Sequence, residues 1–394
     1  MILWPSITLT ARATKRINQG HPWIYSNEID MKMAKKLPPD QFVRVLDQQE
    51  KMIAIAFLNT RSLICGRVIS WNPGESIDID FWRHRLEWAL NLRKNFLKEP
   101  FYRLIHAEAD GFPGMVIDRF GDILVIQLNT GASEVIWQHC QSLISSVLAP
   151  KGIVLRRDSS IRELEGLSMT GPEIIGQVPD IVRFQENQTF FFANLREGQK
   201  TGWFFDQRDQ RHFVATFCKN KTVLDCYCFS GGFSVQAGKA GAKSVLGIDR
   251  SAEALQLAAM AAAENKLQNI CSWQQQEVFK ALEDMQQQNQ KFDVVIVDPP
   301  AFIKSNKDLV AGSRGYRKLA KLSAAVVEKE GFLFFASCSY HMSAADLLAQ
   351  INLGLNDAKR QAKVLYCGQA GIDHPIHPAL PETAYLKAYL LQIF

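Results

Sequence analysis

The loop Asp225-Cys226-Tyr227-Cys228-Phe229-Ser230-Gly231-Gly232-Phe233 follows a short apolar run and precedes a helical pattern. Gly231 and Gly232 lack a Cβ atom, so the backbone can approach a ligand closely at this point. Asp249 ends the next apolar run, and a carboxylate there can accept hydrogen bonds from both hydroxyls of a ribose. The loop alone is equally typical of a plain strand, turn and helix. Together with Asp249, it predicts a nucleoside-binding site.

Strands and helices alternate from Thr222 onward. Helical patterns over 252–265 and 316–327 separate short apolar segments that are rich in β-branched or aromatic residues. Strands that are buried on both faces of a parallel sheet have this composition. We therefore predict an α/β fold with a doubly wound, Rossmann-like sheet. Its expected strands include 222–226, 244–249, 294–298 and 332–336.

The glycine loop lacks the three-glycine fingerprint that binds a pyrophosphate, which favours a ligand other than NAD or FAD. S-adenosylmethionine is a nucleoside without a pyrophosphate, and we predict it as the cofactor. Glu277 lies near the third strand, just before a helical pattern, and can accept the adenine amino group. An acid at a helix N-terminus, stabilised by the helix dipole, is an equally good interpretation of Glu277.

The fourth strand ends in Asp298-Pro299-Pro300-Ala301-Phe302. Two prolines stiffen the chain at the carboxyl edge of the sheet, where doubly wound folds bind their ligands. Such a turn can hold a carboxylate and an aromatic ring toward a flat substrate, with Pro299, Pro300 and Phe302 as its substrate-binding residues. A simple strand terminator is the alternative interpretation.

The fifth strand ends in Ser337-Cys338-Ser339, again at the carboxyl edge. A cysteine at a strand end is often only a small buried hydrophobe. A thiolate at the mouth of the predicted site can instead act as a nucleophile. Methylation of cytosine C5 needs such a group, because addition of a thiolate to C6 activates the otherwise unreactive C5.

Composition and charge limit the classes of protein that remain. With 394 residues, 47% hydrophobic and 22% charged, the chain is typical of a globular protein with more than one domain. We expect a cytoplasmic protein, because neither a secretion signal nor an apolar run of about 18 residues occurs. The eight cysteines lack Cys-x-x-Cys spacing, which predicts neither a metal site nor disulfides.

Two further domains are expected before the α/β domain. The first 75 residues alternate short apolar runs with turn signals, and the next part combines a helical pattern over 81–97 with strands around 114–128. Residues 1–75 also hold ten Lys and Arg against six Asp and Glu. A basic surface suits RNA, although an ordinary solvated face fits as well. The predicted domains are a β-rich domain at 1–75, an α+β central domain at 76–192 and the α/β domain at 193–394.

Several motifs resemble the bacterial 23S rRNA large subunit methyltransferase I family, whose members methylate cytosine C5. The likeness covers nearly the whole chain, and His21 to Ser26 is similar to the start of the family's N-terminal PUA domain. The other matching stretches are Glu108 to Gly114, Lys200 to Arg208, Phe229 to Phe233, Asp298 to Pro300, Ser337 to Ser339 and Pro381 to Lys387.

The resemblance implies a class I methyltransferase that acts on RNA, either 23S rRNA or a large-subunit precursor. It implies that Cys338 is the nucleophile and that Asp298 contacts the target base near N3. The residues implied to line the cofactor site are Asp225, Phe229, Gly231, Asp249, Glu277, Gln207 and Arg208. This chain departs from the family pattern at Phe229-Ser230, Glu277 and Ala301. Ala301 stands where a lysine is frequent, which puts the target site in doubt more than the reaction.

Three points stay open at this stage. The Asp298-Pro299-Pro300-Ala301-Phe302 turn also resembles the turn with which other methyltransferases hold an exocyclic amine, and that chemistry needs no cysteine. A non-catalytic RNA-binding assembly factor is an alternative of another class, although the intact cofactor loop argues against it. Whether the protein is a monomer or a homodimer is not decided by the sequence.

Overall fold

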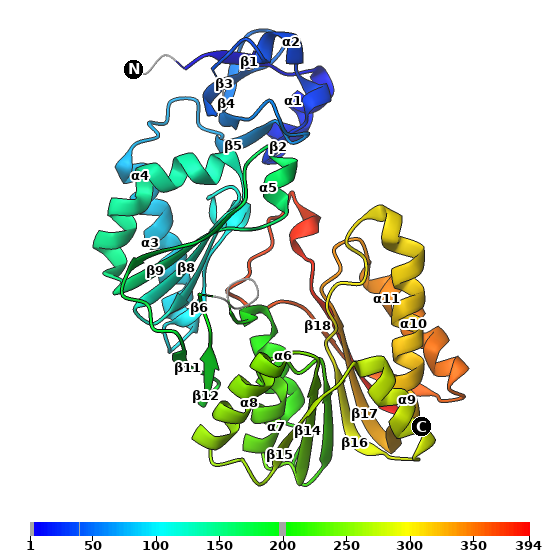
Figure 1. Ribbon diagram of the computed structural model, residues 1–394. Helices are drawn as coiled ribbons and strands as arrows, with labels where there is room; N and C mark the ends of the chain where they lie inside the picture. Colours follow the sequence, from blue (N-terminus) through cyan, green and yellow to red (C-terminus); the bar gives the residue numbers. More distant parts are fainter. Residues whose placement is uncertain (1–3, 39, 197–201) are drawn as a thin grey trace. The chain divides into compact units, whose positions relative to one another are not determined.

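The structure, a computed structural model, describes residues 4–38, 40–196 and 202–394 (Figure 1). Lys200 and Thr201, part of one family-like motif, lie outside the described residues. The chain forms two compact units. The first comprises Met1–Asp180, Leu195–Gly202 and Ile372–Thr383, and the second comprises Ile181–Asn194, Trp203–Gly371 and Ala384–Phe394. The three-domain division at residues 75 and 192 remains a prediction.

The N-terminal part of the first unit is a small domain built on a five-stranded sheet, as its alternating apolar runs predict. The strand order is β1-β3-β4-β5-β2, and only β1 and β3 pair in parallel. Buried aliphatic side chains such as Val43, Ala56 and Val68 form its core. The elements are β1 (Ser6–Thr8), α1 (Ala11–Asn18), β2 (Trp23–Ile24), α2 (Met31–Ala34), β3 (Gln41–Leu46), β4 (Met52–Leu58) and β5 (Gly66–Ser70).

The rest of the first unit is an α+β domain with a second five-stranded sheet, in the order β10-β9-β8-β7-β6. Its helices start at residues that cap them: Asp78 accepts from the backbone of Asp80 and Phe81, and Thr130 accepts from Ser133. The elements are α3 (Ile79–Phe96), β6 (Phe101–His106), β7 (Met115–Phe120), β8 (Ile123–Leu128), α4 (Gly131–Leu148), β9 (Gly152–Arg157), α5 (Ile161–Leu164) and β10 (Thr170–Gly176).

The second unit confirms the predicted doubly wound sheet (Figure 1). Its seven strands follow the order β15-β14-β13-β16-β17-β19-β18, and the first five are parallel. The strands predicted at 222–226 and 244–249 have these bounds in the structure. The strands are β13 (Thr222–Cys226), β14 (Ser244–Asp249), β15 (Cys271–Gln275), β16 (Phe292–Val297), β17 (Val327–Ser337), β18 (Ala362–Gly368) and β19 (Lys387–Ile393).

Helices connect these strands and cover the sheet. The predicted helix 252–265 is α8, whereas the helix predicted from 316 begins earlier and is α10. The antiparallel pair β18 and β19 was not predicted, because β18 exposes residues along most of its length and lacks the apolar pattern of a buried strand. The helices are α6 (Arg208–Ala215), α7 (Gly232–Lys239), α8 (Ala252–Glu264), α9 (Val278–Gln287), α10 (Leu309–Ala325) and α11 (Ala344–Asp357).

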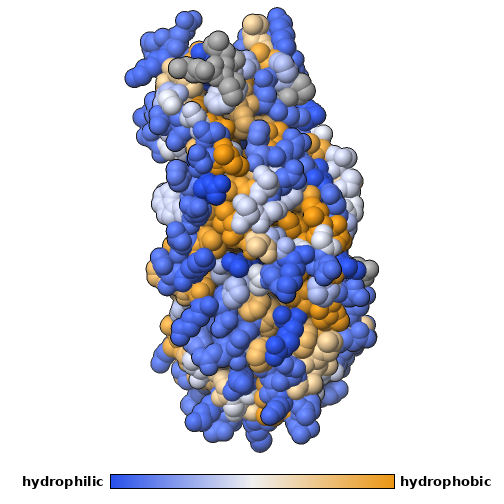
Figure 2. All heavy atoms as spheres, turned by 90° about the vertical axis from the view of Figure 1, so that its left-hand side faces the viewer, coloured by the Kyte–Doolittle hydropathy of each residue, from blue (hydrophilic) through white to orange (hydrophobic). Residues whose placement is uncertain are grey.

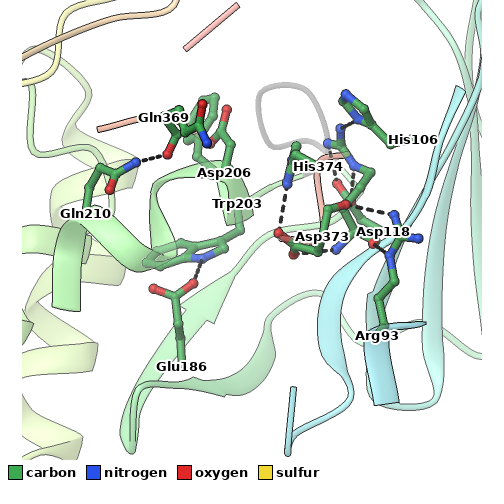
Figure 3. Close-up of polar contacts among 12 residues, drawn as sticks. Arg93, His106, Asp118, Glu186, Trp203, Asp206, Gln210, Gln369, Asp373 and His374 are labelled. Atoms are coloured by element: carbon green, nitrogen blue, oxygen red, sulfur yellow. Dashed lines mark hydrogen bonds and ion pairs between the residues drawn. The ribbon is translucent and has the colours of Figure 1, made fainter. Parts of the chain in front are cut away.

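A buried ion pair fixes the hairpin of β11 (Val182–Glu186) and β12 (Thr189–Ala193) to the second unit. The Glu186 carboxylate accepts two hydrogen bonds from the Arg211 guanidinium, at 2.7 and 2.9 Å. It also accepts from Trp203 Nε1 and Gln236 Nε2, both at 3.0 Å, and the bond from Trp203 is drawn in Figure 3. Because the side chains of both ions are buried, removing either one leaves an uncompensated charge.

The segment Ile372–Thr383 belongs to the first unit and is held there by arginines (Figure 3). The Asp373 backbone oxygen accepts from Arg93 at 2.9 Å, and its carboxylate accepts from the Arg103 backbone at 3.1 Å. His374 contacts the same carboxylate at 2.9 Å. Burial, helped by nearby His374 and arginines, holds the pKa of His106 well below its ordinary value.

The surface drawn in Figure 2 is mainly hydrophilic, with apolar side chains visible in patches between the polar ones. Some large apolar side chains are well exposed, among them Trp88 and Phe96 of α3. Scattered exposure of this kind is normal for a globular protein. None of the helices in the described part of the chain combines the length and apolar character needed to cross a membrane.

We predict that Glu186→Ala destabilises the protein by about 3–5 kcal/mol, because it leaves the Arg211 guanidinium buried without its partner. The matched control is Glu264→Ala, which breaks a pair with Arg183 whose side chains are 35% and 50% exposed. The control should cost less than about 1 kcal/mol. Urea unfolding measures both losses, and equal losses for the two variants would contradict the structural role of Glu186.

Candidate active site

The carboxyl edge of the second unit's sheet brings the predicted motifs together. Strands β14, β13, β16 and β17 are neighbours and run in parallel, so their last residues meet at one edge. Cys226 pairs with Ile248 on one side and with Val297 on the other. Asp249 and Asp298 therefore flank the glycine loop, and Ser337-Cys338-Ser339 ends the next strand.

The glycine loop has an unusual backbone. Tyr227, Phe229 and Gly231 all adopt left-handed conformations, with φ of 62°, 48° and 80°. This conformation costs about 1–3 kcal/mol for a residue other than glycine, so surrounding contacts must hold it. At Gly231 an added Cβ would lie 2.9 Å from the Cβ of Ala258, which leaves no space for a side chain.

Asp249 holds this loop in place. One of its carboxylate oxygens accepts from the Phe229 backbone at 2.9 Å, and the other accepts from the Ser251 backbone at 2.9 Å. The sequence identified Asp249 only as a ribose acceptor, because a contact with the loop is not visible before the strands are paired. The carboxylate is half-buried and has lone pairs left for a ligand.

Several buried polar atoms beside the loop lack hydrogen-bond partners within the described residues. These are Oδ1 of Asp225, Oγ of Ser230 and both amide atoms of Gln207. Buried polar groups normally have partners, so unpaired ones in one region indicate a site for a polar ligand. The ring of Phe204 lies 5.4 Å from that of Phe229, which places the segment before Gln207 against the loop.

The charge on this side of the site is negative. Burial raises the pKa of Asp225 to about 7, although Ser234 donates two hydrogen bonds to it, and the carboxylates of Asp298 and Asp249 raise it further. A ligand with positive charge would relieve this repulsion. S-adenosylmethionine carries a sulfonium and an ammonium group, so these residues fit that cofactor.

Glu277 and Arg208 lie at helix starts next to the loop region. Exposed Glu277 caps α9, since its carboxylate accepts from the Lys280 backbone at 2.9 Å. Burial raises the pKa of Tyr227, and Glu277 and Asp249 are among the acids that raise it further, so the three share one neighbourhood. Arg208 is buried at the start of α6, with its guanidinium 5.4 Å from the Phe205 ring. Their contacts with a cofactor remain predictions.

Tyr316 of α10 organises the cysteine turn. Its buried hydroxyl accepts from Ser337 Oγ at 2.8 Å and lies 2.7 Å from Ser339 Oγ. The Ser339 backbone in turn donates to Ser337 Oγ at 3.2 Å. Cys338 is therefore half-exposed between two serines that are fixed and fully buried. The role of the two serines as anchors of this turn was not predicted from the sequence.

The same phenol also reaches the segment that directly follows Asp298-Pro299-Pro300. Ser339 Oγ accepts from the Ile303 backbone at 3.2 Å, and the Phe302 backbone lies 3.5 Å from the Tyr316 hydroxyl. The Phe302 ring packs 4.8 Å from the Tyr316 ring. Asp298 is half-buried, Pro299 is buried and Pro300 is exposed. Stacking of Phe302 on the substrate stays a prediction. In the structure, the Phe302 ring packs against Tyr316.

A groove of about 810 Å³ lies on the small N-terminal domain. Arg16 lines it, and its guanidinium pairs with Glu28 at 2.5 Å and lies 4.8 Å from the centre of the Tyr25 ring. Arg12 and His21 also line it. The groove thus combines cationic and aromatic side chains, the two kinds of group that bind nucleic acid backbones and bases.

Comparison with protein families identifies the class. Residues 165–392 match the model of S-adenosylmethionine-dependent methyltransferases, which is more than half of the chain. Residues 7–71 match the model of PUA-like domains. The fold, the cofactor loop and these matches define a methyltransferase that uses S-adenosylmethionine and carries an N-terminal PUA-like domain.

Whole-chain relatives make the assignment narrower. Ribosomal RNA large subunit methyltransferase I from Cronobacter sakazakii is 32% identical over 98% of this chain and 99% of its own length. The protein of the same name from Erwinia tasmaniensis is 33% identical over 96% and 97%. This chain therefore belongs to the ribosomal RNA large subunit methyltransferase I family.

Solved structures agree on the fold. A SAM-dependent methyltransferase from Streptococcus mutans has a TM-score of 0.83 at 21% identity, covering 98% of this chain and all of the other. A methyltransferase solved in complex with SAH has a TM-score of 0.84 at 22% identity, with the same coverage.

We predict that Asp249→Ala weakens S-adenosylmethionine binding by about 1–3 kcal/mol, or about 5-fold to 150-fold, because both the loop contact and the ribose acceptor are lost. Calorimetry on the folded variant measures this. The control is Glu253→Ala, which removes an exposed acid near the start of α8 and should bind like the wild type. Equal affinity for Asp249→Ala and the wild type would remove Asp249 from the site.

Proposed function

We propose that this enzyme methylates C5 of a cytosine in 23S ribosomal RNA, with Cys338 as the nucleophile. The observation that carries the proposal is the geometry of the half-exposed Cys338. Tyr316 binds the serines on both sides of it, and Ser339 binds the segment that follows the Asp298-Pro299-Pro300 turn. The substrate class is supported by the relatives, which are named for the large-subunit RNA.

The thiol has a chemical task in this reaction. Cytosine C5 is a weak nucleophile, and addition of the Cys338 thiolate to C6 moves the electron pair of the C5–C6 double bond onto C5. After methylation, a base takes the C5 proton, the electron pair of that C–H bond restores the double bond, and the thiolate leaves. Cys338 is regenerated, and no net change remains on the protein.

The Asp298 turn would hold the base during this sequence. Asp298, when protonated or through a bridging water, would hydrogen-bond N3, which favours addition at C6 by stabilising negative charge on the ring. Pro299 and Pro300 keep the turn rigid, and Phe302 is the aromatic side chain next to it. The base must be unpaired or flipped out for the thiol to reach it.

The cofactor side is formed by the glycine loop and its neighbours. S-adenosylmethionine, when bound, supplies the electrophilic methyl group that C5 takes up. Asp249 would accept the ribose hydroxyls, and Gly231 would keep the loop in the left-handed conformation that receives the cofactor. The unpaired buried atoms of Asp225 and Gln207 would become partners of its polar groups. Phe229, Glu277 and Arg208 complete the proposed set.

The PUA-like domain would contribute RNA affinity. Its groove presents Arg12 and Arg16 with Tyr25, and four of the five excess positive charges of the chain lie in residues 1–75. Contacts between arginines and phosphates are independent of sequence, so this domain would position the RNA and leave base selection to the second unit.

We predict that RNA with 5-fluorocytosine at the target position traps the enzyme, because fluorine at C5 cannot leave as a proton. Cys338→Ser should abolish both the adduct and methyl transfer while S-adenosylmethionine affinity is retained, since serine is a far weaker nucleophile. A denaturing gel detects the adduct, and tritiated methyl transfer measures turnover.

The control for this experiment is Cys367→Ser, which changes an exposed thiol outside the site and should behave like the wild type. Substantial methyl transfer by Cys338→Ser, with no adduct from the wild type, would reject the covalent mechanism. It would favour methylation of an exocyclic amine, for which the Asp298-Pro299-Pro300-Ala301-Phe302 turn suffices.

A further inference from the structure

We propose that Lys387 is the cationic partner of Cys338, which stabilises its thiolate before addition to the base and after release of the product. This inference rests on the proposed function, because it gives the nucleophile of that reaction its charge partner. Lys387 acts through Cys338 and needs no contact with the substrate.

The pairing of strands places Lys387 beside the cysteine. Strand β19 runs antiparallel to β17, and Lys387 is paired with Ser337 at the end of the ladder. Its ammonium donates to the backbone oxygen of Ser339 at 2.6 Å. Lys387 therefore contacts Ser339, which follows Cys338, and is paired with Ser337, which precedes it.

Burial of the Lys387 ammonium costs free energy unless a negative charge lies close to it. Lys387 is only 8% exposed, and within the described part of the chain no carboxylate lies within 4 Å of its ammonium. Burial lowers the pKa of Lys387 to about 8, and the nearby Cys338 opposes this shift. A buried ammonium that contacts only a carbonyl is poorly compensated, and a thiolate at Cys338 would supply the missing negative charge.

The other titratable groups around the turn do not replace Lys387. Burial raises the pKa of Tyr316, so its phenol stays neutral and serves as a hydrogen-bond partner of Ser337 and Ser339. Asp298 follows the neighbouring strand β16, and an acid there disfavours a thiolate. His341 lies on the cysteine's own loop and is half-exposed. Lys387 thus contributes buried positive charge from β19.

Stabilisation by Lys387 depends on the charge that the Cys338 sulfur carries at each step of the reaction. When Cys338 loses its proton to solvent, the ammonium stabilises the resulting thiolate. Formation of the S–C6 bond moves the negative charge from sulfur into the cytosine ring. When that bond breaks, the electron pair returns to sulfur and the ammonium stabilises the leaving thiolate again. Lys387 stays protonated throughout.

The test is the pH dependence of Cys338 alkylation by iodoacetamide, measured on the full chain without RNA or cofactor. A Cys367→Ser background removes the exposed thiol, and mass spectrometry of peptides assigns the alkylated residue. We expect Lys387→Met to slow alkylation of Cys338 about tenfold at pH 7 and to move the profile to higher pH, since a shift of one pKa unit changes the thiolate fraction tenfold. Lys387→Arg retains the charge and should retain most of the wild-type rate.

Thermal unfolding confirms that each variant is folded, and Lys387→Gln takes the place of Lys387→Met if the latter is not. An unchanged alkylation profile in a folded, uncharged variant would overturn the proposal. Equal slowing in Lys387→Arg would overturn it as well, because it would show that shape and not charge is required. Since no RNA is present, this result is independent of whether Cys338 is the nucleophile, which the adduct experiment decides.

Discussion

The hydroxyl group of Tyr316 connects two loops of the site, the one that follows β16 and contains Asp298 and the one that follows β17 and contains Cys338. Pairing of β16 with β17 fixes where both strands end, but it does not fix the turns that follow. The Tyr316 hydroxyl binds Ser337 and Ser339 around the cysteine, and Ser339 continues the chain of hydrogen bonds to the Ile303 backbone. The helix that carries Tyr316 is the crossover from β16 to β17, so the same connection that closes the parallel sheet also aligns the site.

The side chains near the cofactor loop are acidic, whereas a lysine lies at the cysteine turn. This difference in charge suits a cationic cofactor at the first place and a thiolate at the second. Asp225, Asp249 and Asp298 interact closely enough to raise the pKa of Asp225, which creates a place for a cationic cofactor. Lys387 lies at the cysteine turn, where the proposed covalent reaction would need a stabilised anion. The cofactor would therefore be attracted by negative charge, while positive charge would stabilise the thiolate of the proposed nucleophile. Because the negative and positive side chains follow different strands, one edge of the sheet would both bind the cofactor and stabilise the thiolate.

Much of this arrangement could be predicted from the sequence, because it depends on local patterns. The buried strands 222–226 and 244–249 are apolar and lie between turn signals, so their bounds were correct. The common edge of Asp249, Asp298 and Cys338 then follows from the parallel order of strands. The S-adenosylmethionine cofactor was predicted from the glycine loop, and the family match supports it.

What could not be predicted depends on contacts between distant segments. Tyr227 and Phe229 adopt left-handed conformations, and Asp249 binds the Phe229 backbone, but a pattern of residue types reveals neither feature. Tyr316 reads as an ordinary core aromatic within a helix, although it joins two loops. Lys387 belongs to a motif that was identified, but its strand was missed, and without the pairing of β19 with β17 the lysine had no neighbour.

The proposed product of this enzyme is 5-methylcytosine in large-subunit RNA. Mass spectrometry of nucleosides from purified 23S rRNA, compared between cells with and without the protein, tests it most directly. Loss of 5-methylcytosine on deletion, and its return when the wild-type gene is restored, is the predicted result. Unchanged 5-methylcytosine together with loss of an N-methylated nucleoside would contradict the claim.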